Sequence, residues 1–142
     1  MSEQALSDLK VIEYADSVSG SFCAKLMADL GAEVVKVEES PLGDPARQAG
    51  PFPGDKPHPE RSGLYLNANK YGITLNPRTR TGARILKELT GMADILVENM
   101  PSTTMQKLGL DYGSLSHLNP GLIVTSVTPF GQSGAYSDYK GK

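Results

Sequence analysis

The sequence predicts an α/β fold built on a doubly wound, mostly parallel sheet with helices on both faces. Two observations support this prediction. Residues 9–38 carry a complete strand–helix–strand pattern, which implies two parallel strands joined by a right-handed crossover. Short apolar runs then continue to alternate with helical patterns as far as residue 127, so the same sheet should grow by further parallel strands.

The first strand–helix–strand unit is the clearest element of the sequence. An apolar-rich run at 9–14 has the length of a strand, and a β-branched run at 34–37 has the length of a second one. The helical pattern between them stops at Gly31, a residue that adopts the left-handed conformation of helix ends without steric cost. Spacings of three and four predict one apolar helix face made of Phe22, Cys23, Leu26, Met27 and Leu30.

Small residues occupy the turn between this first strand and its helix, namely Ser17, Val18, Ser19 and Gly20. Unpaired N–H groups and the helix dipole at such a position favour an anionic group, above all a phosphate. Serine side chains are also common helix caps, because they satisfy the same N–H groups. The turn lacks the GxGxxG pattern, and the residues leave both interpretations open.

Residues 40–62 differ from the rest of the chain because they are rich in proline and glycine. This composition disfavours a regular helix or a central strand and predicts a long surface loop. Loops of this length in compact domains often serve a function.

The next predicted unit begins with a brief strand at 73–75. Asn76 and Pro77 then resemble a helix start, with Asn76 as the cap and Pro77 as the first helical residue. The helix is expected to end near Gly91 and to point four apolar residues inward: Ile85, Leu86, Leu89 and Met92.

Two more strands are predicted in the last third of the chain. The first covers 94–98 and is followed directly by Asn99, while the second covers 122–127 and leads into a glycine-rich loop. Two short helical patterns separate them. The first pattern ends at Gly109, and the second is capped by Asp111.

The composition excludes several classes of protein. A hydrophobic content of 39% without a long apolar run argues against a membrane protein, and a net charge of −2 argues against nucleic acid as a partner. Cys23 is the only cysteine, and His58 and His117 are the only histidines. We therefore expect no disulfide framework, no metal site and, without a recognisable signal peptide, a cytoplasmic location.

Several segments, taken in order, resemble the amino-terminal part of the family III coenzyme A (CoA) transferases. They read LGAEVVKVE, NANK, DILVEN and FGQSGAY. This family includes formyl-CoA and carnitine CoA transferases and the α-methylacyl-CoA racemases. The resemblance implies that residues 1–142 form the amino-terminal part of a Rossmann-like large domain, with the loop at 40–62, in a fold whose two chains interlock as a homodimer.

The resemblance also implies an activity. Family members move CoA from an acyl-CoA to a carboxylic acid, through aspartyl anhydrides and an enzyme-bound CoA thioester. CoA and its thioesters are substrates, and no cofactor is bound permanently. The family's catalytic aspartate comes just after the segment that matches 136–142. The catalytic residue is therefore expected beyond Lys142, and the isolated chain is expected to be inactive.

Candidate CoA-binding residues follow from the positions that match the family. The resemblance implies that the turn contacts CoA, that Lys70 lies near the CoA phosphates and that Lys107 lies near the nucleotide end. It also implies that Asn99, in the VEN motif, lies at the CoA and that the glycine-rich loop lies beside the catalytic centre. The full set is Ser17, Val18, Ser19, Gly20, Lys70, Asn99, Lys107, Gly131 and Gln132. Glu39 departs from the pattern, because some members carry arginine there.

Three alternatives compete with a CoA transferase. The first is an acyl-CoA racemase of the same family, which would remove a proton next to the thioester carbonyl. The second is a non-catalytic module that binds CoA. The third is an NAD-binding domain, against which the missing GxGxxG argues.

Overall fold

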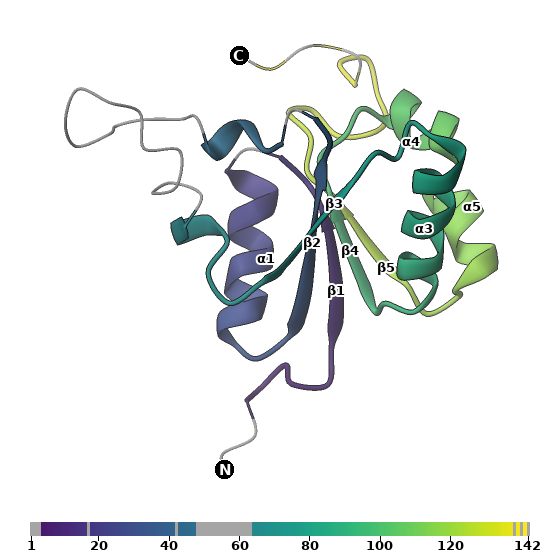
Figure 1. Cartoon of the computed structure of the whole chain (residues 1–142). Helices are drawn as coiled ribbons and strands as arrows, with labels where there is room; N and C mark the ends of the chain where they lie inside the picture. Colours follow the sequence, from purple (N-terminus) through teal and green to yellow (C-terminus); the bar gives the residue numbers. More distant parts are fainter. Residues whose placement is uncertain are drawn as a thin grey trace.

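The computed structural model describes residues 4–16, 18–41, 43–47, 64–137, 139 and 141. They form a five-stranded sheet in the order β3-β2-β1-β4-β5, and every neighbouring pair of strands is parallel (Figure 1). This confirms the predicted doubly wound α/β fold. The strand order reverses beside β1, between β2 and β4, and ligands of such folds bind at the carboxyl ends of the strands near this point.

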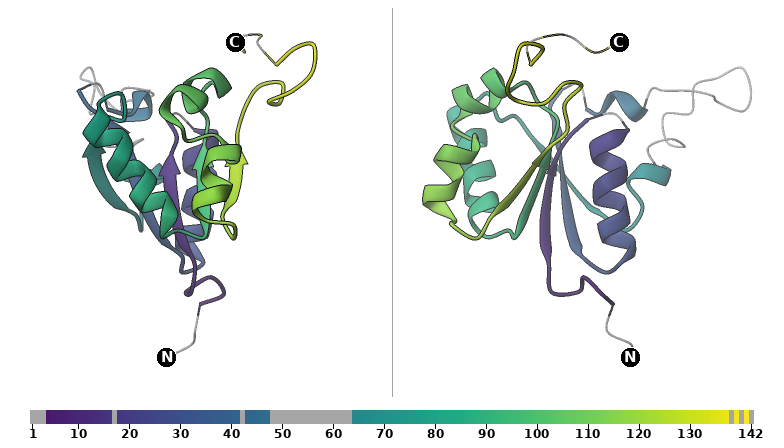
Figure 2. Two further views of the ribbon diagram at one scale, coloured as in Figure 1. Left: turned by 90° about the vertical axis from the view of Figure 1, so that its right-hand side faces the viewer. Right: turned by 180° about the vertical axis from the view of Figure 1, so that it is seen from behind.

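Helices cover both faces of the sheet. α1 packs on one face, and α3, α4 and α5 lie on the other (Figures 1 and 2). The bounds are β1 Lys10–Tyr14, α1 Ser19–Asp29, β2 Glu33–Glu39, the 3₁₀ helix η1 Pro45–Arg47, β3 Tyr71–Leu75, α3 Arg80–Gly91, β4 Ile95–Glu98, α4 Ser102–Leu108, α5 Tyr112–Leu118 and β5 Ile123–Ser126. The strands thus lie where the sequence placed them, within a few residues.

Each face of the sheet has its own core, because side chains alternate along the strands. In β1, Val11 packs toward α1 and Ile12 packs toward the other helices. The α1 side is lined mostly by valine and alanine, whereas the other side holds the larger Leu86, Leu96 and Leu115. The two faces also bury acidic groups, with Glu13 on the first and Glu98 on the second.

The buried face of α1 differs from the predicted one. The helix packs on the sheet through small residues, and Gly20, Ala24 and Ala28 are buried, whereas Phe22, Leu26 and Leu30 are 40–52% exposed and Cys23 and Met27 are half-buried. The reason is the close approach of helix and strand: a Cβ atom on Gly20 would lie 2.6 Å from the Cβ of Ala15. Large side chains do not fit on that face.

The start of α3 was also predicted wrongly. Thr79, not Asn76, caps the helix, and its side-chain oxygen accepts a hydrogen bond from the N–H of Gly82 at 3.0 Å. Asn76 and Pro77 form a turn before it, in which the Asn76 side chain accepts from the N–H of Arg78. Gly91 is the last helical residue as expected, but Met92 is exposed because it lies beyond the last helical turn.

The segment after β2 is less exposed than the sequence suggested. Residues 48–63, most of the predicted loop, lie outside the described residues. Within 43–47, η1 forms and buries Asp44 and Ala46. The Asp44 carboxylate accepts from the N–H of Ala46 at 2.8 Å and pairs with Lys36, which explains why this part turns back onto the sheet.

In the part of the chain that the structure describes, every helix is too short or too polar to cross a lipid bilayer.

We expect Gly20→Ala to destabilise the protein by about 1–3 kcal/mol, because the added methyl group overpacks the α1–β1 contact. The better helix propensity of alanine, about 1 kcal/mol, offsets only part of this loss. Urea denaturation gives the difference. Gly72→Ala in β3 is the matched control, since a Cβ atom there meets nothing within 4 Å. Equal stability of the two variants would contradict the close approach.

Candidate functional site

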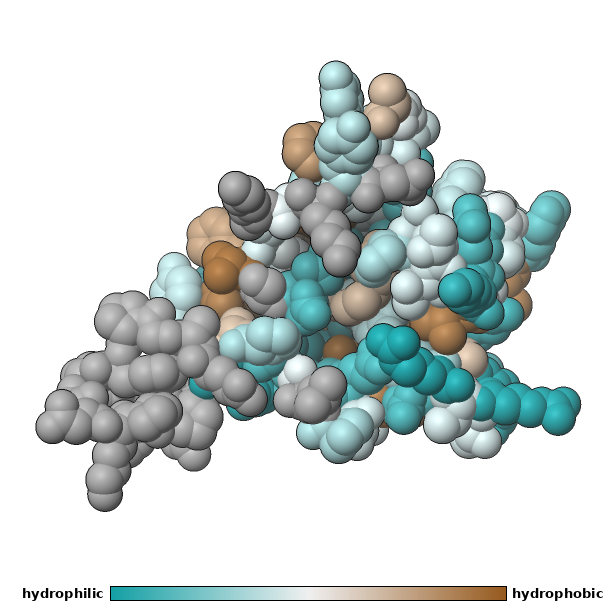
Figure 3. Space-filling model, turned by 90° about the horizontal axis from the view of Figure 1, so that it is seen from above, coloured by the Kyte–Doolittle hydropathy of each residue, from teal (hydrophilic) through white to brown (hydrophobic). Residues whose placement is uncertain are grey.

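The carboxyl edge of the sheet is the candidate site. The segments that follow β1, β2, β4 and β5 meet there and line two neighbouring cavities. Figure 3 looks onto this edge from above and shows hydrophilic and hydrophobic side chains mixed across it. Met100, in the segment between β4 and α4, lines both cavities and is therefore their common wall.

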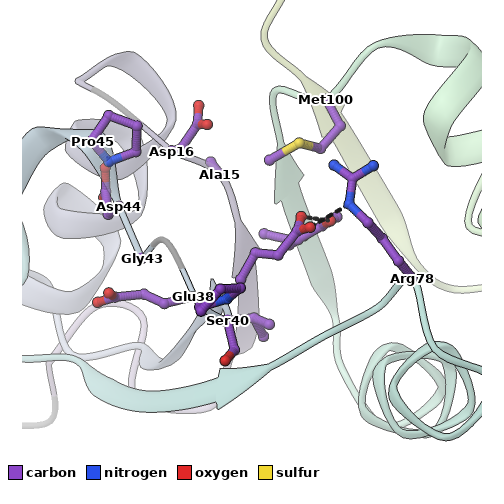
Figure 4. Close-up of a pocket in the computed structure, with 13 residues that line it drawn as sticks. Ala15, Asp16, Glu38, Ser40, Gly43, Asp44, Pro45, Arg78 and Met100 are labelled. Carbon is purple, nitrogen blue, oxygen red and sulfur yellow. Dashed lines mark hydrogen bonds and ion pairs between the residues drawn. The ribbon is translucent and has the colours of Figure 1, made fainter.

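The first cavity has a volume of about 220 Å³ and lies above β1 and β2. Figure 4 shows Arg78 and Met100 on one side of it and Asp44 and Pro45 on the other. Tyr14 and Glu39 complete the wall beside Arg78.

Glu39 links two strands at this cavity. Its carboxylate forms an ion pair with Arg78 and accepts a hydrogen bond from the hydroxyl group of Tyr14 at 3.2 Å. Burial and the nearby Glu39 carboxylate raise the pKa of Tyr14 above its usual value, so the hydroxyl stays protonated and donates. Through this ion pair Arg78 brings a guanidinium group to the same edge of the sheet.

Glu38 and Arg47 fix the segment below this cavity. The Arg47 Nε atom donates to Glu38 at 2.9 Å, and this guanidinium holds the pKa of the Glu38 carboxyl below its usual value. The charges of Glu38 and Arg47 therefore neutralise each other.

The second cavity has a volume of about 450 Å³ and lies above β4 and β5. Asn99, Met100 and Ser102 line it from the β4–α4 side, and Gly131 and Gln132 line it from the loop after β5. Pro101, Pro129 and Tyr139 add apolar surface. The cavity thus combines a few polar groups with apolar walls, as small-molecule sites do.

Asn99 joins the two halves of the sheet at the point where the strand order reverses. Its Oδ1 atom accepts from the N–H of Asp16 at 3.0 Å, and its Nδ2 atom donates to the carbonyl oxygen of Asp16 at 2.7 Å. These two hydrogen bonds hold the segment after β1 against the segment after β4. The segment after β1 leads into α1.

Glu98 is a buried carboxyl below the second cavity. It accepts hydrogen bonds from the N–H of Met100 at 2.8 Å and from the Nε2 atom of Gln132 at 3.2 Å. Burial raises the pKa of Glu98 above its usual value, although the hydrogen bonds from Ser126 and Met100 oppose this shift.

A buried network of charges lies on the α1 side of the sheet. The Lys36 ammonium group is 2.7 Å from the carboxylates of both Glu13 and Asp44, and it donates to the Ser21 hydroxyl at 3.0 Å. Lys70 reaches the other Glu13 oxygen at 2.6 Å and the carbonyl oxygen of Ser21 at 2.7 Å. Two cations and two anions therefore neutralise each other under α1.

The two lysines respond differently to this environment. Burial works against the charge of Lys36, but the Glu13 and Asp44 carboxylates outweigh it and raise the pKa of Lys36. Burial lowers the pKa of Lys70, and the single Glu13 carboxylate does not fully compensate. Among the residues described, no group of three or more His, Cys, Asp or Glu side chains could hold a metal ion.

The structure brings together some of the residues predicted for CoA binding. Asn99, Gly131 and Gln132 line the same cavity. Val18, Ser19 and Gly20 lie at the start of α1, just after the Asp16–Asn99 contact, and Val18 makes no side-chain cap. Ser19 is the first helical residue and is not the cap, and Ser17 lies outside the described residues.

The two predicted lysines lie elsewhere. Lys70 lines a third cavity, of about 620 Å³, beside the amino end of β2, and its ammonium group points inward to Glu13. Lys107 is an exposed residue in the last turn of α4, whose first residues line the second cavity. Their contact with CoA stays a prediction.

Sequence reasoning missed several groups at this edge, namely Asp16, Glu98, Arg78 and Tyr14. One signal was present for Glu98, because a carboxyl at the end of the apolar run at 95–97 is unusual in a buried strand. The Arg78–Glu39 pair had no such signal, since 38 residues separate its members and only the β2–β3 pairing brings them together.

Comparison with known proteins finds similarity to CoA-transferases. The model of the family described as CoA-transferase family III matches residues 6–142. Succinate–glutarate CoA-transferase of Agrobacterium fabrum is 39% identical over 140 residues, which cover 96% of this chain and 35% of that protein. Succinyl-CoA–D-citramalate CoA-transferase of Chloroflexus aurantiacus is 39% identical over 139 residues, covering 96% of this chain and 33% of that protein.

A solved structure shares the fold. The CAIB/BAIF family protein from Brucella suis superposes with a TM-score of 0.88 at 37% identity, over 99% of this chain and 37% of that one. The chain spans about a third of the length of the relatives it matches.

We expect Lys36→Met to destabilise the protein by about 3–5 kcal/mol, because it leaves the buried Glu13 and Asp44 carboxylates without their shared cation. Thermal or urea unfolding at pH 7 measures the loss. The control is Arg84→Met, which removes an exposed ion pair with Glu88 in α3 and should change stability by less than about 0.5 kcal/mol. A loss at Lys36 as small as the loss at Arg84 would show that the network is not structural.

Proposed function

The chain belongs to CoA-transferase family III, and on this basis we propose that the carboxyl edge of its sheet binds the CoA moiety of an acyl-CoA. The protein to which the chain contributes would transfer CoA from that thioester to a carboxylic acid. One observation supports this above the others: Asn99, Gly131 and Gln132, which the family resemblance assigns to CoA, converge on one cavity from two separate segments.

The shape of the edge suits a long ligand. CoA is an extended molecule with a pantetheine arm and a nucleotide, and it would occupy more than one cavity. The cavities of about 450 and 220 Å³ adjoin at Met100 and form a row along the carboxyl ends of the strands. Phosphate groups favour charge-assisted contacts, and the exposed Lys107 is the residue we assign to the nucleotide end.

The pantetheine arm is the part that matches the second cavity. It carries two amides separated by methylene groups, and it needs a few hydrogen-bonding partners between apolar walls. Gln132 provides an amide, while Met100, Pro101 and Pro129 provide apolar surface. The binding energy of such a remote part of the substrate serves to position the thioester for reaction.

The chemistry would follow the course that the resemblance implies. An enzyme carboxylate attacks the thioester carbonyl, the C–S bond breaks, and the CoA thiolate leaves behind a mixed anhydride. The thiolate then attacks the enzyme's carbonyl carbon and releases the first acid, which leaves a CoA thioester on the enzyme for the acceptor carboxylate. We assign the nucleophile to a segment outside residues 1–142, so this chain alone would bind CoA without turnover.

Further proposals concern the whole protein. We propose that residues 1–142 are the amino-terminal part of its large domain and that it works as an interlocked homodimer in the cytoplasm. The exposed face of α1 supports the proposal of a dimer, because monomers rarely expose several large apolar residues together. These residues are Phe22, Leu26 and Leu30. The unpaired thiol of Cys23 is consistent with a reducing compartment.

Calorimetric titration of the 142-residue chain with CoA tests the proposal. We expect binding in the micromolar range and none to NAD. Thr103→Trp, which fills the second cavity, should weaken CoA binding at least tenfold. Thr81→Trp is the matched control, because it makes the same change at an exposed residue of α3 that lines neither cavity, and it should leave the affinity unchanged.

A second comparison separates the two ends of the ligand. Lys107→Ala should weaken binding of CoA several-fold but leave binding of pantetheine, which lacks the phosphates, unchanged. If a folded sample binds neither CoA nor pantetheine, the proposed site is wrong for this chain. Binding of NAD in place of CoA would support the dinucleotide-binding alternative.

A further inference from the structure

Glu98 is a buried acid without a basic partner among the residues that the structure describes. Its side chain is 1% exposed and points into the face covered by α3, α4 and α5. The groups around it come from α4, the start of α5, β5, the loop after β5 and the neighbouring strand β1. They are Ser102, Met105, Gln106, Asp111, Tyr112, Val124, Ser126, Gln132 and, in register on β1, Tyr14. Of these, only Asp111, Tyr112 and Tyr14 titrate, and none is a cation.

Hydrogen bonds make up for the missing cation. The N–H of Met100 donates to Oε2 at 2.8 Å and the Nε2 atom of Gln132 donates to Oε1 at 3.2 Å, while the nearby Ser126 hydroxyl also favours the ionised form. These donors belong to the two segments that line the second cavity and to the strand between them. Glu98 therefore ties together both walls of that cavity from below.

The contact with Gln132 also determines which end of its amide faces outward. A side-chain amide has an NH₂ group that only donates and an oxygen that only accepts. An ionised Glu98 only accepts, so Gln132 must turn its NH₂ group down toward Glu98. The Oε1 atom accepts no hydrogen bond from the described residues, and Gln132 lines the second cavity, so we infer that this atom faces the cavity.

We propose that Glu98 is a positioning residue that fixes the amide of Gln132 so that its oxygen accepts a hydrogen bond from an N–H or O–H donor of the bound substrate. This rests on the proposed function, under which the donor is an amide N–H or the hydroxyl group of the pantetheine arm. Protonated Glu98 donates one hydrogen bond itself. The Gln132 amide is then free to turn over and to present its NH₂ group to the same donor, which disfavours binding.

The buried environment of Glu98 supports a pH dependence of this contact. Burial raises the pKa of Glu98 above its usual value, so its charge changes at a less acidic pH than that of an exposed glutamate. The geometry also determines the direction of the pH dependence. The ionised form of Glu98 orders Gln132 for binding, so pantetheine affinity should fall as the pH drops and Glu98 becomes protonated.

NMR spectroscopy of the 142-residue chain tests the link between the two residues without any ligand. We expect the Glu98 carboxyl carbon and the Gln132 side-chain NH₂ signals to shift with one common midpoint, above the usual value of about 4.3. Gln132→Ala, a change at an exposed residue, should raise that midpoint, because the ionised form loses a hydrogen-bond donor. Separate midpoints, or no change in Gln132→Ala, would overturn the proposal.

Affinity for pantetheine tests the consequence for binding. The wild-type chain should bind severalfold more weakly below the Glu98 midpoint than above it, whereas Glu98→Gln should lose this pH dependence. Glu88→Gln, at an exposed residue paired with Arg84, should keep it. A common NMR midpoint with a pH-independent affinity would overturn the role toward substrate. Absence of pantetheine binding at every pH would instead contradict the proposed function, while the NMR result would still decide the Glu98–Gln132 link.

Discussion

The Lys36 ammonium group lies under α1 with carboxylates on two sides, and the rest of the structure depends on this interaction. It connects β1 through Glu13, α1 through Ser21 and the segment after β2 through Asp44. Lys70 extends the same network to the segment before β3. Buried charges are tolerated only when they are paired and hydrogen-bonded, so the four elements must be in place together. The network thus fixes the segments that lead to the carboxyl edge.

The opposite face of the sheet follows a different rule. It packs through large aliphatic side chains, and two of its polar residues, Asn99 and Glu98, make their contacts at the carboxyl edge. There, Asn99 holds the segment after β1, and Glu98 holds the segments after β4 and β5. Both residues use side-chain groups to order loops that have no regular backbone pairing. A rigid scaffold that presents irregular loops in this way is the usual basis of a binding site in α/β proteins.

The α1 face of the sheet and its carboxyl edge have different roles. The α1 face provides stability through ion pairs and close packing, and its small residues leave the large apolar side chains of α1 on the outside. The carboxyl edge provides the adjoining cavities to which we assign the proposed binding of CoA. In this arrangement the ammonium group of Lys70, a candidate for contact with phosphate, donates to Glu13 and to the carbonyl oxygen of Ser21 inside the protein.

The sequence by itself determined the order of strands and helices, the parallel sheet and the family, because these depend on local periodicity and on short motifs. It also indicated that Asn99, Gly131 and Gln132 follow strands, and residues that follow parallel strands meet at the carboxyl edge of the sheet. Only the tertiary structure decided which face of α1 is buried, because the close contact of Gly20 with Ala15 lies outside any helical pattern. The same holds for the Arg78–Glu39, Lys36–Asp44 and Glu98–Gln132 contacts, whose partners are brought together by strand pairing and loop packing.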